Sequence, residues 1–275
     1  MKAWWILGCC LGQSLLAQTL PVHIEESHAG AFYHLVETLP LREPHTLLLI
    51  DAHCDANGMA NSDEIRKAIR RGPTTQHRAA MLAEWRKTGK IQCYNWIEPL
   101  MPAPIAEVIW IPAARLTEKD RAALETDARE YLDAHEEALP REAGALGPRY
   151  RVLSLEDFAR EARAWPESRP VVASVDLDYF AKSADADLEA QMEGIMNLLL
   201  HLRAPRSLSF ANSSPYLKYA AQAQRLTTLA LDAAWRIPNA QEHFDPFAKT
   251  GPDRSLMARL LERQGRRLPA FDVTT

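Results

Sequence analysis

Short apolar runs of strand type alternate with longer stretches of helical pattern along most of this chain. Two of the runs, Leu47–Ile50 and Val171–Val175, are almost entirely apolar, which is typical of strands that are buried on both faces. Strands that are separated by helices pair in parallel, and the helices then pack against the sheet. The alternation therefore predicts an α/β fold, a three-layer α/β/α domain with a mostly parallel sheet.

The expected elements follow one another with short connections. Strands are expected at Val22–Glu25, His45–Ile50, Glu107–Ile111, Arg151–Leu153, Pro170–Val175 and Ser207–Phe210. Helices are expected at Ala29–Leu39, from Ser62 onward, and at Arg78–Lys87, Thr117–Ala138, Leu155–Trp165, Leu188–Leu202, Tyr216–Trp235 and Ser255–Arg266. Two proline-containing stretches, Pro99–Pro104 and Gly144–Pro148, are interpreted as loops, so residues 18–275 are expected to form a single domain.

The composition is that of an ordinary globular protein of 275 residues. Its 36 acidic and 32 basic residues nearly balance and no long basic run stands out, so a nucleic-acid partner is not expected. Lys2 precedes a mostly apolar stretch, Ala3–Leu16, that is too short for a permanent membrane span. Residues 1–17 are therefore interpreted as a signal peptide of a periplasmic or secreted protein, with a cytoplasmic protein as the alternative.

Two acidic motifs directly follow the two most apolar strands. The first holds Asp51, His53 and Asp55, and the second holds Asp176 and Asp178. Because the carboxyl ends of parallel strands meet at one edge of a sheet, these side chains are expected to converge, each motif sharing a face if the chain stays extended. Four carboxylates at close range would repel one another and resist ionisation unless cations lay between them. The motifs predict a metal site, most simply for two divalent ions.

A sixth ligand is expected at His28, which follows the first strand and begins the next helix. A strand-end histidine, an Asp-x-His-x-Asp string and a Ser-x-Asp-x-Asp string in this order resemble the arginase/ureohydrolase superfamily. The segments Val175–Phe180, Asn95–Pro99, Val108–Pro112 and Asn212–Pro215 are similar to an uncharacterised branch of that superfamily, which includes peptide arginases. The resemblance implies an arginase/deacetylase-like fold and two manganese ions.

The resemblance also implies how the ligands are shared and what the site does. One ion would be held by His28, Asp51, Asp55 and Asp176, and the other by Asp51, His53, Asp176 and Asp178. Asp55 is also a candidate to orient the nucleophilic hydroxide by a hydrogen bond. The implied reaction cleaves a guanidino group, with an arginine of a peptide as the leading substrate and ornithine and urea as products.

Three further residues are assigned to catalysis or substrate binding. His77 is the candidate proton carrier, and Asn57 is either a substrate contact or a turn residue. Ser214 is expected to contact the substrate. The chain departs from the superfamily pattern at Ser27, where an acidic residue is usual, and at Tyr179–Lys182, where an Asp-Pro pair is usual.

Three other classes of protein share parts of this pattern. A deacetylase-type amidohydrolase of the same fold would use one metal ion and leave Asp55 and Asp178 without a role. A manganese-dependent nucleotide-sugar transferase would use Asp176 and Asp178 but leave the first motif unexplained. A non-enzymatic metal-binding protein would be expected to have lost some of the six ligands, all of which are present.

Overall fold

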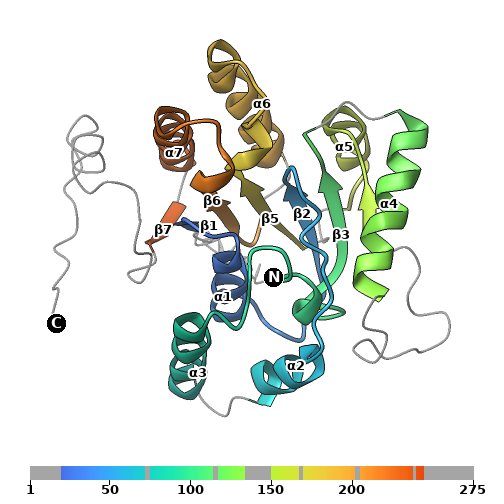
Figure 1. The fold of residues 1–275 in the computed structure, drawn as a ribbon, viewed down its shortest axis with the longest axis vertical. Coiled ribbons are helices and arrows are strands. Elements are labelled where there is room, and N and C mark those ends of the chain that lie inside the picture. Colours follow the sequence, from blue (N-terminus) through green and yellow to red (C-terminus); the bar gives the residue numbers. More distant parts are fainter. Residues whose placement is uncertain are drawn as a thin grey trace, which may run out of the picture.

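Seven parallel strands form one sheet in the part of the chain that the computed structural model describes, namely residues 20–71, 75–113, 117–133, 150–166, 170–201, 205–237 and 240–244. They are β1 (Leu20–Glu25), β2 (His45–Ile50), β3 (Ile105–Ile111), β4 (Tyr150–Val152), β5 (Val171–Asp176), β6 (Leu208–Ala211) and β7 (Ala240–Phe244). Their order across the sheet is β4-β3-β2-β5-β6-β1-β7, and each neighbouring pair is parallel (Figure 1).

Helices cover both faces of this sheet (Figure 1). They are α1 (Ala29–Thr38), α2 (Ser62–Arg71), α3 (Thr75–Thr88), α4 (Glu118–Asp133), α5 (Leu155–Ala162), α6 (Leu188–His201) and α7 (Ala220–Trp235). Buried side chains of α1, α2, α3 and α4 share one core with the sheet, and those of α5, α6 and α7 share the other. The predicted three-layer α/β/α architecture is confirmed.

Strand β2 shows why the apolar runs are uninterrupted. Successive side chains of a strand point to opposite faces. Leu47 and Leu49 therefore lie in the core beneath α1 and α2, while Leu48 and Ile50 lie in the core beneath α6 and α7, and all four are fully buried. Each such side chain contributes about 1.5–3 kcal/mol through burial, so a polar residue would be costly on either face.

The direction in which the chain crosses the sheet reverses between β2 and β5. From β2 the chain proceeds to β3 and β4 toward one edge, whereas from β5 it proceeds to β6 toward the other. In open α/β sheets, ligands bind beyond the carboxyl ends of the strands at such a reversal. Ile50 of β2 is opposite Val175 of β5, so the next residues, Asp51 and Asp176, lie together at this position.

Two expectations from the sequence differ from the structure. Helix α7 begins at Ala220 and not at Tyr216, because Pro215 lies in a separate short 3-10 helix, Ser214–Tyr216, after which the chain is extended. Strand β7 was not predicted, since its sequence contains three polar residues in five and carries little apolar pattern.

Some expectations concern residues outside the described part of the chain. These are the signal peptide at 1–17, the loop at 144–148 and the helix at 255–266. Within the described residues, no helix is both long enough and apolar enough to cross a membrane.

Candidate metal centre

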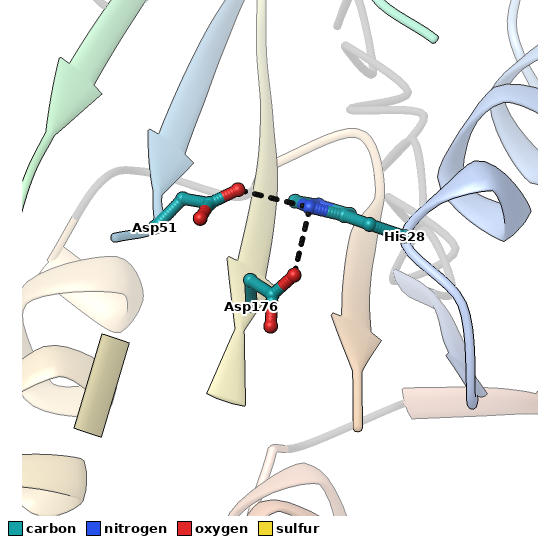
Figure 2. A group of neighbouring side chains, drawn as sticks. All are labelled: His28, Asp51 and Asp176. Carbon is teal, nitrogen blue, oxygen red and sulfur yellow. Dashed lines mark ion pairs between the residues drawn. The ribbon is translucent and has the colours of Figure 1, made fainter. Parts of the chain in front are cut away.

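Three separate parts of the chain bring His28, Asp51 and Asp176 into contact (Figure 2). Asp51 directly follows β2 and Asp176 is the last residue of β5, so the pairing of these two strands places both carboxylates at one edge of the sheet. His28 lies between β1 and α1, at the residue that precedes the first turn of the helix. All three are buried, and their side chains point toward one another (Figure 2).

The Nδ1 atom of His28 faces three carboxylates at short range. It lies 3.0 Å from Asp51 Oδ2, 2.8 Å from Asp55 Oδ2 and 3.2 Å from Asp176 Oδ2. Despite these distances, His28 Nδ1 and Asp51 Oδ2 are buried atoms that make no hydrogen bond of acceptable geometry. Buried polar atoms in native proteins almost always have a partner, and these two unpartnered atoms belong to a group of side chains that could hold a metal ion.

The other ring nitrogen of His28 is held by a serine. Its Nε2 lies 2.7 Å from Ser174 Oγ, which in turn lies 2.8 Å from Ser209 Oγ. A neutral His28 that donates its Nε2–H to Ser174 presents a lone pair at Nδ1 to the three carboxylates. Such a lone pair requires a proton or a metal cation between it and the anions.

A second group of potential ligands shares Asp51 with the first. It consists of Asp51, His53 and Asp178, whose ligand atoms all lie within 4.8 Å of one another. His53 Nδ1 is 2.8 Å from Asp178 Oδ2 and 3.8 Å from Asp51 Oδ1. The side chain of His53 is 59% exposed, so this second group is open to solvent.

Asp55 joins the first group from the loop that follows β2. Its Oδ2 lies 2.8 Å from His28 Nδ1 and accepts a hydrogen bond of 2.7 Å from the indole N–H of Trp96. Its backbone φ of 50° is in the left-handed region, which aspartate adopts more readily than most residues. His28, Asp51, His53, Asp55, Asp176 and Asp178 are together called the six-residue cluster below.

The expectation that each motif stays extended is wrong. Strand β2 ends at Ile50, and the N–H of His53 bonds back to Asp51 Oδ1 at 2.7 Å. After β5 the chain enters a 3-10 helix, and the N–H of Asp178 bonds back to Asp176 Oδ1 at 3.0 Å. Aspartate side chains commonly form such turns with the backbone two residues on. The turns, and not strand alternation, therefore bring the motif residues together.

Several residues hold the cluster without belonging to it. Ser213 donates a hydrogen bond of 2.7 Å to Asp176 Oδ2, and the indole N–H of Trp110 donates one of 2.9 Å to the Asp51 carbonyl. No role was expected for Ser174 or Ser213 from the sequence. Trp96 was within a segment that resembles the superfamily, and a buried indole N–H needs an acceptor, but no sequence pattern indicated that Asp55 would be that acceptor.

Burial and mutual repulsion perturb the titration of the metal-free cluster. Burial, together with the charges of Asp55 and Asp176, raises the pKa of Asp51 well above its usual range. Burial also raises the pKa of Asp176 against the opposing effect of His28. For His28, burial lowers the pKa, but its contacts with Asp176, Asp51 and Asp55 outweigh that effect and raise it well above the usual value. Without a cation, the cluster therefore retains protons.

A cavity of about 440 Å³ opens onto the cluster. Its lining includes His53, Asp55, Asp176 and Asp178, together with neighbours of His53 and Asp55 and residues from four other segments. They are Ala52, Cys54, Asn57, Cys93, Tyr94, Trp110, Leu124, Asp127, Ala128, Ser213 and Tyr216. Cys54 and Cys93 are both half-buried free thiols.

Of the three other predicted site residues, one lines this cavity and two do not. Asn57 is half-buried and lines it. Ser214 is exposed and bonds to Glu26, through its N–H at 2.9 Å and its hydroxyl at 3.1 Å, while its neighbour Ser213 lines the cavity. His77 is exposed on α3 and does not line the cavity.

The donor set fits hard divalent ions. Four carboxylates would balance the charge of two dications, and oxygen donors combined with imidazole suit manganese, while zinc and iron accept the same ligands. Buried His28 Nδ1 and Asp51 Oδ2 are the atoms that such ions would satisfy. The cluster is therefore a possible metal site, with residues for more than one ion.

Comparison with known proteins adds little to this geometry. No protein-family model and no curated protein matches the chain. The chain is similar to the arginase from Bacillus caldovelox, with 13% identity over 78% of this chain and 67% of that chain and a TM-score of 0.39. It is also similar to a cold-adapted arginase from the psychrophilic yeast Glaciozyma antarctica, with 14% identity over 77% and 68% of the two chains and a TM-score of 0.36. Identities and TM-scores this low support no conclusion about the fold or the activity of this chain.

Proposed function

We propose that the six-residue cluster holds two divalent metal ions and that the protein is a hydrolase of guanidino groups. His28, Asp51, Asp55 and Asp176 would hold one ion, and Asp51, His53, Asp176 and Asp178 the other. Asp51 and Asp176 would bridge the pair. We propose manganese as the metal, because carboxylate-rich ligation with imidazole suits it.

The position of His28 Nδ1 carries this proposal. A buried imidazole nitrogen that faces three carboxylate oxygens within 3.2 Å, without a hydrogen bond, is the environment of a metal ligand. An ordinary buried ion pair would have satisfied both Nδ1 and the Asp51 oxygen. The second group, which shares Asp51, supports two ions over one.

The charge of the cavity suits a cationic substrate. Its lining contains the carboxylates of Asp55, Asp176 and Asp178, and no lysine or arginine is among the described residues that line it. A planar guanidinium is attracted to such an anionic cavity. Two divalent ions bound beside it would lower the pKa of a shared water and so supply a nucleophile at neutral pH.

The chain itself would orient the reactants. Trp96 holds one oxygen of Asp55 at 2.7 Å, and we assign to Asp55 the role of accepting a hydrogen bond from the nucleophile. Asn57, which lines the cavity, is assigned to substrate binding, and so is Ser214. Addition of water to the guanidinium carbon and cleavage of its bond to the side-chain nitrogen would release urea and leave an amine. With an arginine of a peptide as the substrate, that amine is an ornithine residue.

A metal count combined with a urea-release assay tests the proposal. Native protein should bind two metal ions per chain and release urea from peptidyl arginine. Asp51→Ala and Asp176→Ala should each reduce the metal content below two ions and abolish urea release, because each carboxylate serves both ions. Asp187→Asn, which changes an exposed aspartate that neither belongs to the cluster nor lines the cavity, is the control and should behave as native protein. Two retained ions in either alanine variant would refute the bridging assignment.

We also propose that residues 1–17 are a cleaved signal peptide and that residues 18–275 form one domain. Export would place the enzyme in the periplasm or outside the cell, where an external peptide is the substrate. N-terminal sequencing of the protein purified from its natural source tests this. A mature chain that begins at Met1 would refute cleavage and favour a cytoplasmic substrate.

A further inference from the structure

The outer wall of the cavity is built by residues that belong neither to the cluster nor to any of the sequence motifs. Leu124 and Asp127, three residues apart on α4, present one face of that helix to the cavity. Tyr94 and Tyr216 line it from two other segments. These four residues are called the rim below.

The rim leaves room for more than a guanidinium group. A guanidinium has four heavy atoms, and at about 30 Å³ for each water-sized atom it fills on the order of 100 Å³. The cavity measures about 440 Å³. The cavity therefore has room beside the rim for further atoms of a substrate whose guanidinium reaches the cluster.

Both tyrosines of the rim expose much of their surface. Tyr94 is 50% exposed and Tyr216 is 56% exposed. Four large hydrophobic side chains are exposed in the described part of the chain, and these are two of them. The Tyr216 ring lies 5.8 Å from the His53 ring, so the rim is continuous with the cluster. Exposed tyrosine faces at the entrance of a cavity attract cations through the charge distribution of the ring.

Asp127 adds a negative charge to the rim. The four carboxylates of the cluster would be balanced by two dications, whereas Asp127 lies outside the cluster. No hydrogen bond or ion pair joins its exposed carboxylate to another described residue, and the described lining holds no lysine or arginine. Among the described residues, the outer cavity lining therefore remains negative even when the metal ions are bound.

We propose that the rim binds a second cationic group of the substrate, with Asp127 as its charge partner and Tyr94 and Tyr216 as its aromatic walls. This proposal rests on the guanidino-hydrolase function. Two sources of the second cation share this chemistry, namely a basic side chain next to the target arginine and a free α-ammonium on the arginine itself. In both cases Asp127 determines substrate specificity and takes no part in the reaction.

Four substrates with one or two cations test the rim. Acetyl-Gly-Arg-Gly-amide carries the guanidinium alone, acetyl-Lys-Arg-Gly-amide and acetyl-Gly-Arg-Lys-amide add a basic side chain, and arginine amide adds the α-ammonium. Asp127→Asn should lower kcat/KM for dicationic substrates about two- to fivefold, through a higher KM, and leave acetyl-Gly-Arg-Gly-amide unchanged. The loss should shrink at high salt, since the rim is exposed.

A second variant of the same helix separates local from general charge effects. Glu130→Gln removes the same charge from an exposed position of α4 that does not line the cavity, and it should change no substrate. A loss confined to the lysine peptides assigns the cation to a flanking side chain, and a loss confined to arginine amide assigns it to the α-ammonium. Equal effects of Asp127→Asn on all four substrates would overturn the proposal.

Failure of the hydrolase proposal can be distinguished from failure of the rim proposal. If native protein releases no urea from any of the four substrates, the hydrolase proposal fails. Calorimetric measurement of the binding of the same four compounds to metal-loaded protein then tests the rim proposal without any reaction. Tighter binding of the dicationic compounds that disappears in Asp127→Asn supports it, and equal binding of all four compounds overturns it.

Discussion

Removal of the Ser174 hydroxyl should weaken the metal site without touching a metal ligand. Ser174 is fully buried in β5, and its Oγ lies 2.7 Å from His28 Nε2. Ser174→Ala removes that partner and leaves a buried Nε2–H without an acceptor, which costs about 1–3 kcal/mol. The ring also loses the contact that fixes its orientation toward the carboxylates. Partners of this kind typically contribute 10- to 100-fold in metal affinity, and we expect a loss in that range, roughly 1.4–2.7 kcal/mol.

The chain contains a matched control for this change. Ser207 is likewise fully buried, and its Oγ lies 2.8 Å from Nε2 of the buried His34, away from the cluster. Ser207→Ala should therefore lower the free energy of unfolding by a similar amount but leave metal affinity unchanged. Manganese titration and thermal melts with and without metal measure both quantities, since bound metal stabilises the folded state. Native metal affinity in Ser174→Ala, or an equal loss in Ser207→Ala, would refute the reasoning.

Two further predictions concern pH and packing. Contacts with Asp176, Asp51 and Asp55 raise the pKa of His28 against the effect of its burial, and burial together with the charges of Asp55 and Asp176 raises that of Asp51. Metal must therefore displace protons, so affinity should rise with pH and binding should release protons. Calorimetry in two buffers of different ionisation enthalpy measures that release, and an affinity that does not vary with pH contradicts it. Gly30→Ala should destabilise the fold by about 1–3 kcal/mol, because the new Cβ would lie 1.7 Å from the buried Glu25 carboxyl carbon. Gly194→Ala, where nothing lies within 4 Å, should instead stabilise helix α6 by about 0.5–1 kcal/mol, and denaturant unfolding that gives both changes the same sign would contradict this.

The fold class and the position of the site were predictable from short-range patterns. Strand β2 has the predicted bounds, His45–Ile50, and its apolar run Leu47–Ile50 was the signal, because a strand that is buried on both faces favours apolar residues at successive positions. The motifs at the ends of β2 and β5 were therefore expected at the same edge of the sheet, since parallel strands end at the same edge. Whether the two strands would be neighbours was not visible in the sequence, and their pairing is what places Asp51 beside Asp176.

The contacts that complete the site were not predictable. Ser174 and His28 are 146 residues apart, and Trp96 and Asp55 are 41 apart, so no local pattern records either pair. The turns at Asp51 and Asp176 could have been expected, because aspartate side chains bond to the backbone two residues on, but the extended-chain interpretation overlooked them.

The sequence by itself determined which side chains of this protein can bind cations and that they lie at the carboxyl ends of strands. Only the tertiary structure decided that His28 Nδ1 faces three carboxylates and that Asp127 of α4 lies at the mouth of the same cavity. The physical reason is the distance along the chain over which each feature is determined. Strand and helix patterns depend on neighbours a few residues away, whereas the environment of a buried atom depends on which distant segments pack against it.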